Sequence, residues 1–163
     1  MVNKTDLIEI LNGIPWFLEF NQKQLDNLAS IASIVEIQKE ESIFCEGDRV
    51  DNVYTLLSGE VDVFATIPSR GQVHIYFAEP LDIIGWSRMT PVVRQRTASA
   101  VAVRDTRLLV LNGDELSELC ENDSHVGYVI MKRLANVVAS NVLMFKLQLM
   151  EQIVQTSDQV IPE

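Results

Sequence analysis

Basic residues are scarce in this sequence. Thirteen Lys and Arg residues stand against 23 Asp and Glu residues, which gives a formal net charge of −10. Proteins that bind DNA, RNA or anionic membranes without a dedicated pocket need clustered Lys and Arg to contact the phosphates. The charge therefore argues against this kind of binding. A protein with this negative charge can still contain a local basic pocket, and such a pocket favours one small anion over a polymer.

Cysteine and histidine are also rare, with two of each. Cys45 and Cys120 lack CxxC spacing, so we expect reduced thiols. His74 and His125 are not spaced for a metal site or a catalytic triad, and a metal-binding cupin-type barrel would need several converging histidines. No GxSxG, HExxH or Walker-type loop occurs. We therefore expect no enzyme activity, no catalytic residue, no metal and no cofactor.

The sequence lacks an export signal and a long uncharged apolar run. The start "MVNKTDLIEI" has neither a cationic segment nor an apolar core, and no uncharged run is long enough to cross a bilayer. We expect a soluble, cytoplasmic protein without membrane contacts. The length of 163 residues and the hydrophobic content of 47% fit one domain, or one domain with an added helix.

Helical spacing opens the chain, within residues 1–32. Leu7, Ile10 and Leu11 lie at helical intervals before Gly13 and Pro15 end the pattern. Asn21 is a candidate N-cap for a second helix, with Leu25, Leu28 and Ala29 on one face. We expect two short helices ahead of the main body of the fold.

The period changes at Ser33, and short β-branched and aromatic runs fill residues 33–111. Many of them alternate, as in Val61, Val63 and Ala65, and turn signals such as Gly47-Asp48 and Ser58-Gly59 separate them. Regularly spaced short strands predict a sandwich, a roll or a small barrel. The runs are "SIVEIQ", "ESIFCEG", "NVYTLLSG", "EVDVFAT", "QVHIYFAE", "TASAVAV" and "TRLLVLN".

Helical spacing returns over residues 112–155, ahead of a polar tail, 156–163, that we expect to be flexible. Asn112 is a candidate N-cap, and a long helix is expected from His125 to about Val154. Its apolar residues form two sets: one to pack on the barrel (Val126, Val129, Ile130, Leu134 and Val137), and one at heptad-like spacing (Leu143, Leu147, Met150 and Val154). The second set predicts a homodimer formed through this helix.

Several short motifs, in their order and spacing, resemble the cyclic nucleotide-binding domain. "ILNGIPWFLEFNQKQLDNLA" is similar to the helical lead-in of that family, and "EGD" at 46–48 and "SGEV" at 58–61 are similar to its β-roll turns. The stretch 82–98, with Gly85 near its start and "RTA" at 96–98, stands in the place of the phosphate-binding cassette. The resemblance implies an α+β fold, namely a double-stranded β-helix (a jelly-roll-like β-roll) with short N-terminal helices and a long C-terminal helix like that of the catabolite activator group.

The cassette segment offers groups that bind an anion. A guanidinium gives a cyclic phosphodiester paired, charge-assisted hydrogen bonds, and the hydroxyl of Thr97 adds a donor. Gly85 before "WSRM" is suited to a tight turn into a short helix, whose first backbone N–H groups add further donors. Arg96 stands in the family register, whereas Arg94 fits the pattern of a related branch better and would point to the same face of an extended segment. Both are candidates. The alternative is that they are surface arginines paired with acidic residues.

The sequence departs from the family immediately after Gly85. The family places a glutamate there for the ribose hydroxyl, and this chain has Trp86, whose indole N–H is a donor only. Ser87 can accept one hydrogen bond without a charge. Where catabolite activator relatives place hydroxyl residues on the long helix to meet the base, this chain has Phe145 and Lys146.

Two functions remain open at this point. The resemblance implies a regulatory domain that binds a cyclic nucleotide such as cAMP or cGMP and signals through the long helix and a dimer, or through a protein partner, without reading DNA itself. The alternative is a degenerate β-roll that acts as a dimeric protein-interaction scaffold or binds another small anion.

Overall fold

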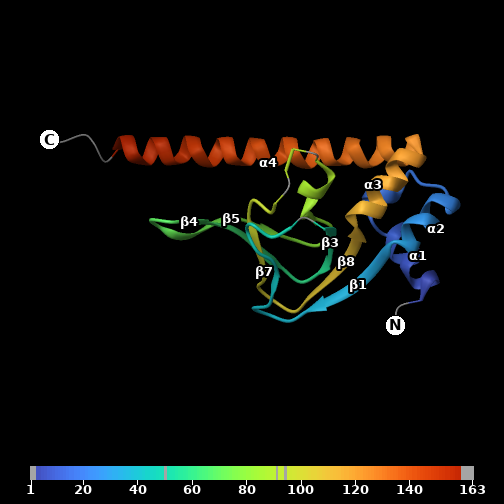
Figure 1. The fold of residues 1–163 in the computed structure, drawn as a ribbon. Helices are drawn as coiled ribbons and strands as arrows, with labels where there is room; N and C mark the ends of the chain where they lie inside the picture. Colours follow the sequence, from blue (N-terminus) through green and yellow to red (C-terminus); the bar gives the residue numbers. More distant parts are fainter. Residues whose placement is uncertain (1–2, 50, 91, 94, 159–163) are drawn as a thin grey trace.

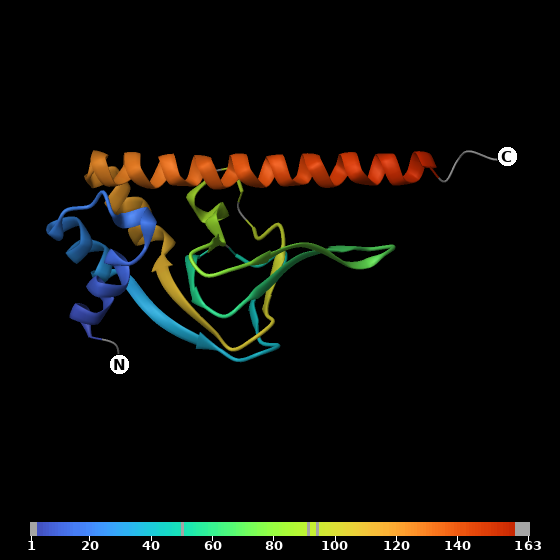
Figure 2. The same cartoon turned by 180° about the vertical axis from the view of Figure 1, so that it is seen from behind.

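The computed structural model describes residues 3–49, 51–90, 92–93 and 95–158. Two four-stranded antiparallel sheets form a β-roll, with helices packed against one of them (Figures 1 and 2). The predicted α+β class and β-roll architecture are confirmed. The order of elements is α1 (Lys4–Asn12), η1 (Pro15–Phe17), α2 (Gln22–Ser30), β1 (Ala32–Ile37), β2 (Ser42–Phe44), β3 (Asn52–Ser58), β4 (Val61–Ile67), β5 (Gly71–Ala78), β6 (Ile83–Ile84), η2 (Trp86–Met89), β7 (Ser99–Ala102), β8 (Thr106–Asn112), α3 (Gly113–Asn122) and α4 (Ser124–Asp158).

The predicted helix starts are confirmed by their caps. The Asn21 side chain accepts from the backbone N–H of Gln24, and the Gln24 side chain accepts in return from the Asn21 backbone. The Asn112 side chain accepts from the backbone N–H groups of Asp114 and Glu115 at the start of α3. Two short elements have no counterpart in the sequence prediction: η1 and the two-residue strand β6.

The first sheet, in the order β1–β8–β3–β6, is the middle layer of the molecule. Successive side chains of a strand point to opposite faces, so β8 sends Leu109 and Leu111 toward the helices and Leu108 and Val110 toward the second sheet. Burial on both faces explains why β8 is an almost unbroken apolar run. The second sheet, β2–β7–β4–β5, closes the roll.

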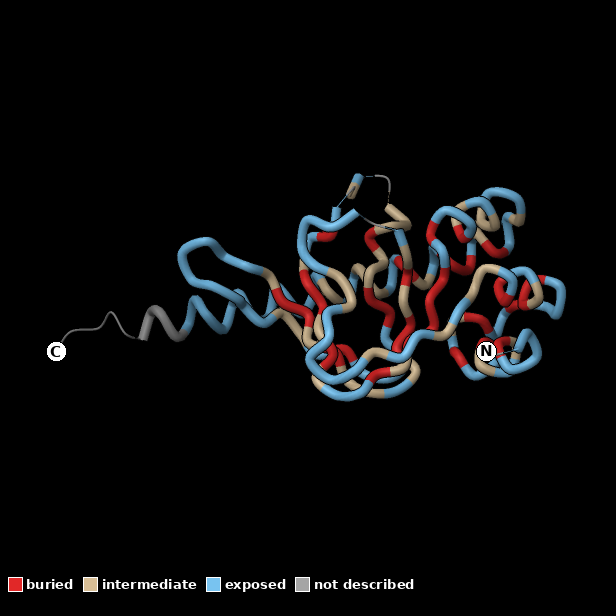
Figure 3. Tube along the Cα trace, turned by 60° about the horizontal axis from the view of Figure 1, so that its bottom comes forward, coloured by how far each residue is buried: buried red, intermediate tan, exposed pale blue. Residues whose placement is uncertain are grey.

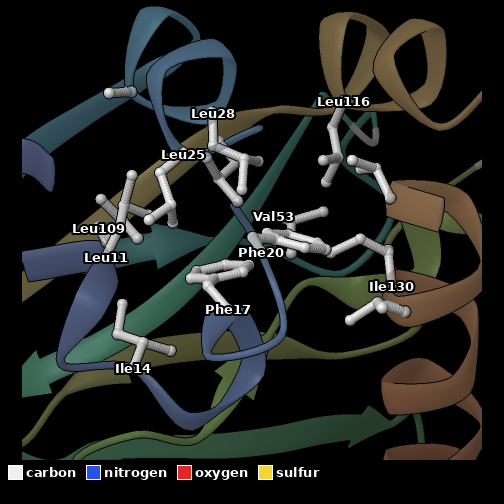
Figure 4. Close-up of a cluster of buried hydrophobic side chains, with 14 of the residues drawn as sticks. Leu11, Ile14, Phe17, Phe20, Leu25, Leu28, Val53, Leu109, Leu116 and Ile130 are labelled. Atoms are coloured by element: carbon white, nitrogen blue, oxygen red, sulfur yellow. The ribbon is translucent and has the colours of Figure 1, made fainter. Parts of the chain in front are cut away.

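The larger hydrophobic core lies between this middle layer and the helices. Phe17, Leu28 and Ile130 come together there from η1, α2 and α4, together with Val53 of β3 (Figure 4). Of the apolar set predicted to pack against the barrel, Val126, Val129, Ile130 and Leu134 are buried and Val137 is partly exposed. These residues pack on the N-terminal helices as well as on the sheet.

The C-terminal half of α4 projects past the roll, in the same direction as the β4–β5 hairpin (Figures 1 and 2). Figure 3 shows both segments as largely exposed. The exposed side chains of this half of α4 are mostly apolar and include Leu143, Leu147, Met150 and Val154. By length and composition alone, Ser124–Val154 could cross a membrane, but one such helix does not indicate a membrane protein.

Candidate functional site

A cavity of about 320 Å³ lies between the second sheet, the cassette segment and α4. We call it the Arg96 cavity. Its size is at the lower end of the range for small-molecule sites, about 300–1,000 Å³. The described residues that line it are Phe44, Val63, Ile75, Tyr76, Ile84, Gly85, Trp86, Ser87, Arg96, Thr97, Ala98, Asn141 and Phe145.

Arg96 is the charged residue of this lining. Its exposed fraction is only 4%, and its guanidinium lies over the Phe44 ring, 4.5 Å from the ring centre, with Tyr54 at 5.7 Å. Nη1 donates to the Gly85 carbonyl and Nη2 to the Asn52 carbonyl, each at 2.7 Å. The alternative of a surface arginine therefore does not hold for Arg96, because two aromatic rings and two backbone carbonyls hold it inside the roll.

Arg96 lacks a direct ionic partner within the part of the chain that the structure describes. Among the described residues, no carboxylate forms an ion pair with it. Burial lowers the pKa of the guanidinium, while Tyr54, Asp51 and Asp48 act in the opposite direction. Its Nε is buried and has no hydrogen-bond acceptor. A buried cation with unused donors is favourable only when an anion or water satisfies it.

Gly85 is required by the geometry around Arg96. Its φ of 71° lies in the left-handed region, and a Cβ atom there would come within 2.6 Å of Arg96 Nη1 and 3.0 Å of the Tyr54 ring. The predicted tight turn into a short helix is confirmed, because Gly85 caps the 3₁₀ helix η2. Because glycine has no Cβ atom, Arg96 can approach closely enough for its Nη1 to donate to the Gly85 carbonyl.

Trp86 separates the Arg96 cavity from the larger core. It lines the cavity and also a small apolar void of about 20 Å³ beside Phe17, Leu116 and Ile130. The indole is half-buried and packs on that core. It therefore forms part of the wall and leaves the cavity open.

The start of α3 is tied to the site by backbone contacts. The Gly113 N–H donates to the Asp51 carbonyl at 2.9 Å, and the next residue, Asn52, accepts from Arg96. Arg88 of η2 forms an ion pair with Asp114 of α3. In turn α3 meets α4 closely, since a Cβ atom on Gly127 would lie 2.6 Å from the Cys120 carbonyl oxygen. A continuous chain of contacts therefore joins Arg96 to the base of α4.

A second groove adjoins the Arg96 cavity under α4. It measures about 480 Å³ and lies between η1, β5 and α4, and Tyr76 and Asn141 line both hollows. Burial, with a smaller contribution from Asp82, raises the pKa of Tyr76 to about 12, so its hydroxyl is protonated at neutral pH. The middle of α4 therefore covers open space.

Most of the predicted binding residues meet in this one cavity. Gly85, Trp86, Ser87, Arg96, Thr97 and Phe145 all line it, although they come from separate segments. Lys146 is exposed and is not part of the lining, since it follows Phe145 by one helix position and so points elsewhere. Arg94 lies outside the described residues. The prediction missed Tyr76 and Asn141, which no local motif marks.

The sequence model named "Cyclic nucleotide-binding domain" matches residues 34–123, more than half of the chain. This protein belongs to the cyclic nucleotide-binding domain family. Members are mostly soluble and cytoplasmic, and they are generally non-enzymatic. No curated protein shows a significant match to the sequence.

Solved structures agree with this family over most of the chain. A putative cyclic nucleotide-binding protein from Geobacter metallireducens is 27% identical, with a TM-score of 0.74 over 87% of this chain and 99% of that one. A cyclic nucleotide-binding domain from Methylobacillus flagellatus is 26% identical, with a TM-score of 0.66, covering 98% of this chain and 85% of that one.

The catabolite activator protein of Thermus thermophilus is also similar. It is 26% identical, with a TM-score of 0.67 over 82% of this chain and 62% of that protein. This chain therefore corresponds to somewhat less than two thirds of that regulator.

Proposed function

We propose that this protein is a regulatory domain that binds a 3′,5′-cyclic nucleotide in the Arg96 cavity. The observation that supports this best is the buried guanidinium of Arg96, which lines a cavity without an ion-pair partner among the described residues. A cyclic phosphodiester supplies one negative charge and two oxygens to its unused N–H donors. Phe145 and Trp86 offer aromatic surface to the base.

The test is calorimetric titration of the protein with cAMP and with cGMP. Saturable binding of at least one of them is expected, and 5′-AMP, which carries a larger charge and an open phosphate, should bind more weakly. Absence of heat with both cyclic nucleotides at millimolar concentration, together with no shift of the melting temperature, would refute the proposal.

In this proposal, α4 carries the signal. An anion at the unused donors of Arg96 attracts the same guanidinium that the Gly85 and Asn52 carbonyls hold, and these carbonyls belong to segments that contact α3. A shift there reaches α4 through the α3–α4 contact at Gly127. A ligand can bias the position of α4 only if it binds one arrangement more tightly than the other. Comparing hydrogen exchange in α4 with and without nucleotide tests this step, and identical protection in both states would contradict it.

We further propose that the exposed apolar half of α4 forms a homodimer. Leu147 is 57% exposed, and its neighbours in the heptad-like set are similarly exposed. Monomeric proteins rarely leave such a continuous apolar surface uncovered. Light scattering should give twice the chain mass for the wild type, and Leu147→Glu should reduce it to one chain. Lys146→Gln, which changes the adjacent residue without altering the apolar set, should remain a dimer.

The second candidate function is binding of a different small anion with an apolar body. The apolar wall, with Val63, Ile75 and Ala98 among its members, favours it. Titration with an aromatic carboxylate such as benzoate separates the two candidates. Only the second candidate function predicts saturable binding of benzoate without binding of a cyclic nucleotide.

A further inference from the structure

The Arg96 cavity contains no carboxylate among the described residues that line it. Its polar side chains other than Arg96 are the neutral groups of Tyr76, Ser87, Thr97 and Asn141, together with the indole of Trp86. The described lining therefore offers a cation that can bind an anion, but no charged acceptor for a hydroxyl group.

Trp86, which lies beside the anion-binding donors, cannot supply the charged acceptor that is missing. Trp86 follows directly on Gly85, whose carbonyl accepts from Arg96 at 2.7 Å. The indole N–H only donates, so it cannot accept a hydrogen bond from a sugar hydroxyl. Its ring packs on the core beside Phe17 and Leu116 and lines the cavity at the same time. The tryptophan therefore holds this part of the wall apolar.

A sugar hydroxyl in this cavity gains little, whichever way the sugar is oriented. Among the described side chains that line the cavity, the hydroxyl can donate only to a neutral oxygen of Tyr76, Ser87, Thr97 or Asn141, and against an apolar side chain it leaves water without compensation. A neutral hydrogen bond formed in exchange for one to water contributes far less than a bond to a charged acceptor. Binding then depends on the charge of the phosphate and on the contact of the base with the apolar wall.

We infer that this site selects cyclic nucleotides by their phosphate and base, and that it is indifferent to the 2′-hydroxyl. Ribo- and 2′-deoxyribo-3′,5′-cyclic nucleotides then bind with similar affinity, and Trp86 is the residue that determines this specificity. The inference depends on the proposed function, because it concerns how the same cavity recognises its ligand.

The test is a paired titration of the wild-type protein with cAMP and 2′-deoxy-cAMP, or with the two corresponding cGMP ligands if guanine is preferred. The dissociation constants are expected to differ by less than about tenfold, the limit for one neutral hydrogen bond. A loss of more than about tenfold for the deoxy ligand overturns the inference while leaving the proposed function intact. If no cyclic nucleotide binds, the proposed function fails, and the inference fails with it.

Substitutions at Trp86 test the determinant itself. Trp86→Glu introduces the missing charged acceptor and should raise the preference for the ribo ligand above about tenfold. Trp86→Phe keeps an aromatic wall without any acceptor and should leave the ratio unchanged. A folded W86E protein that binds both ligands equally would overturn the role of Trp86. If W86E does not fold, as judged by circular dichroism, the paired titration of the wild type still decides the inference.

Discussion

Replacing Arg96 with methionine separates its role in binding from its role in the fold. Methionine keeps an unbranched apolar side chain beside Phe44 and Tyr54 and removes the charge. In the free protein the change leaves the Gly85 and Asn52 carbonyls without their donor, at about 1–3 kcal/mol each. It also removes the desolvation penalty of a buried cation, which is on the order of several kcal/mol. Since the two effects oppose each other, we expect a folded protein destabilised by no more than about 3 kcal/mol.

The effect on binding has no such compensation. Two charge-assisted hydrogen bonds to a phosphodiester contribute about 1.5–3 kcal/mol each, so their loss should raise Kd by about 10²–10⁴-fold. Calorimetry measures this directly, and the rise in melting temperature caused by ligand provides a second measurement.

The matched control is Arg104→Met. Arg104 is well exposed and pairs with Glu60 at 3.2 Å, so its removal should change stability little. It is not among the residues that line the Arg96 cavity, so Kd should stay within about twofold of the wild-type value. A folded R96M protein with the wild-type Kd would show that the buried guanidinium is purely structural, and it would refute the proposed site.

Three further predictions follow from the geometry. Gly85→Ala should lower the free energy of unfolding by more than Gly47→Ala does. Both glycines have a positive φ, a conformation that costs a non-glycine residue about 1 kcal/mol, but only at Gly85 would the new Cβ meet Arg96 and Tyr54. Equal losses of stability in urea denaturation would contradict this. A hydrogen bond from Gln24, with further ones from the backbone at Val126 and His125, lowers the pKa of Asp123 in the folded state. Its contribution to stability is therefore present above the unfolded pKa of about 3.9 and is lost as the pH falls through the folded value. The wild type should lose stability below about pH 4 more steeply than Asp123→Ser, which keeps a capping hydroxyl without a titrating group; parallel pH profiles would show that this carboxylate does not matter. Burial, with a smaller contribution from Glu121, raises the pKa of Cys120 to about 11, whereas Cys45 is exposed. At pH 8, Ellman's reagent should react with one fast and one slow thiol, and a fast phase that survives in C45S would contradict this assignment.

Local sequence patterns determined most of the elements. The N-caps at Asn21 and Asn112 satisfy backbone N–H groups two or three residues away, so a short segment contains all the information needed to predict them. Strands β3 and β4 alternate as expected of strands with one buried face, and β8 has the apolar composition of a strand buried on both faces. Alternating β-branched and aromatic residues also mark β5, although most of its side chains are exposed. By contrast, β6 and η1 are too short to show a period, and their conformation depends on pairing with β3 and on packing against the core.

The sequence by itself determined the α+β class, the caps and the presence of two arginines near an anion-binding type of segment. Only the tertiary structure decided that Arg96 is buried, because its hydrogen-bond partners lie 11 and 44 residues away, at Gly85 and Asn52, and its aromatic neighbours belong to the strands β2 and β3. The same holds for Tyr76 and Asn141, which meet only because β5 and α4 face each other across the cavity. The burial and the charge balance of a site depend on contacts with segments that are distant in the sequence, so a local pattern of residues cannot predict them.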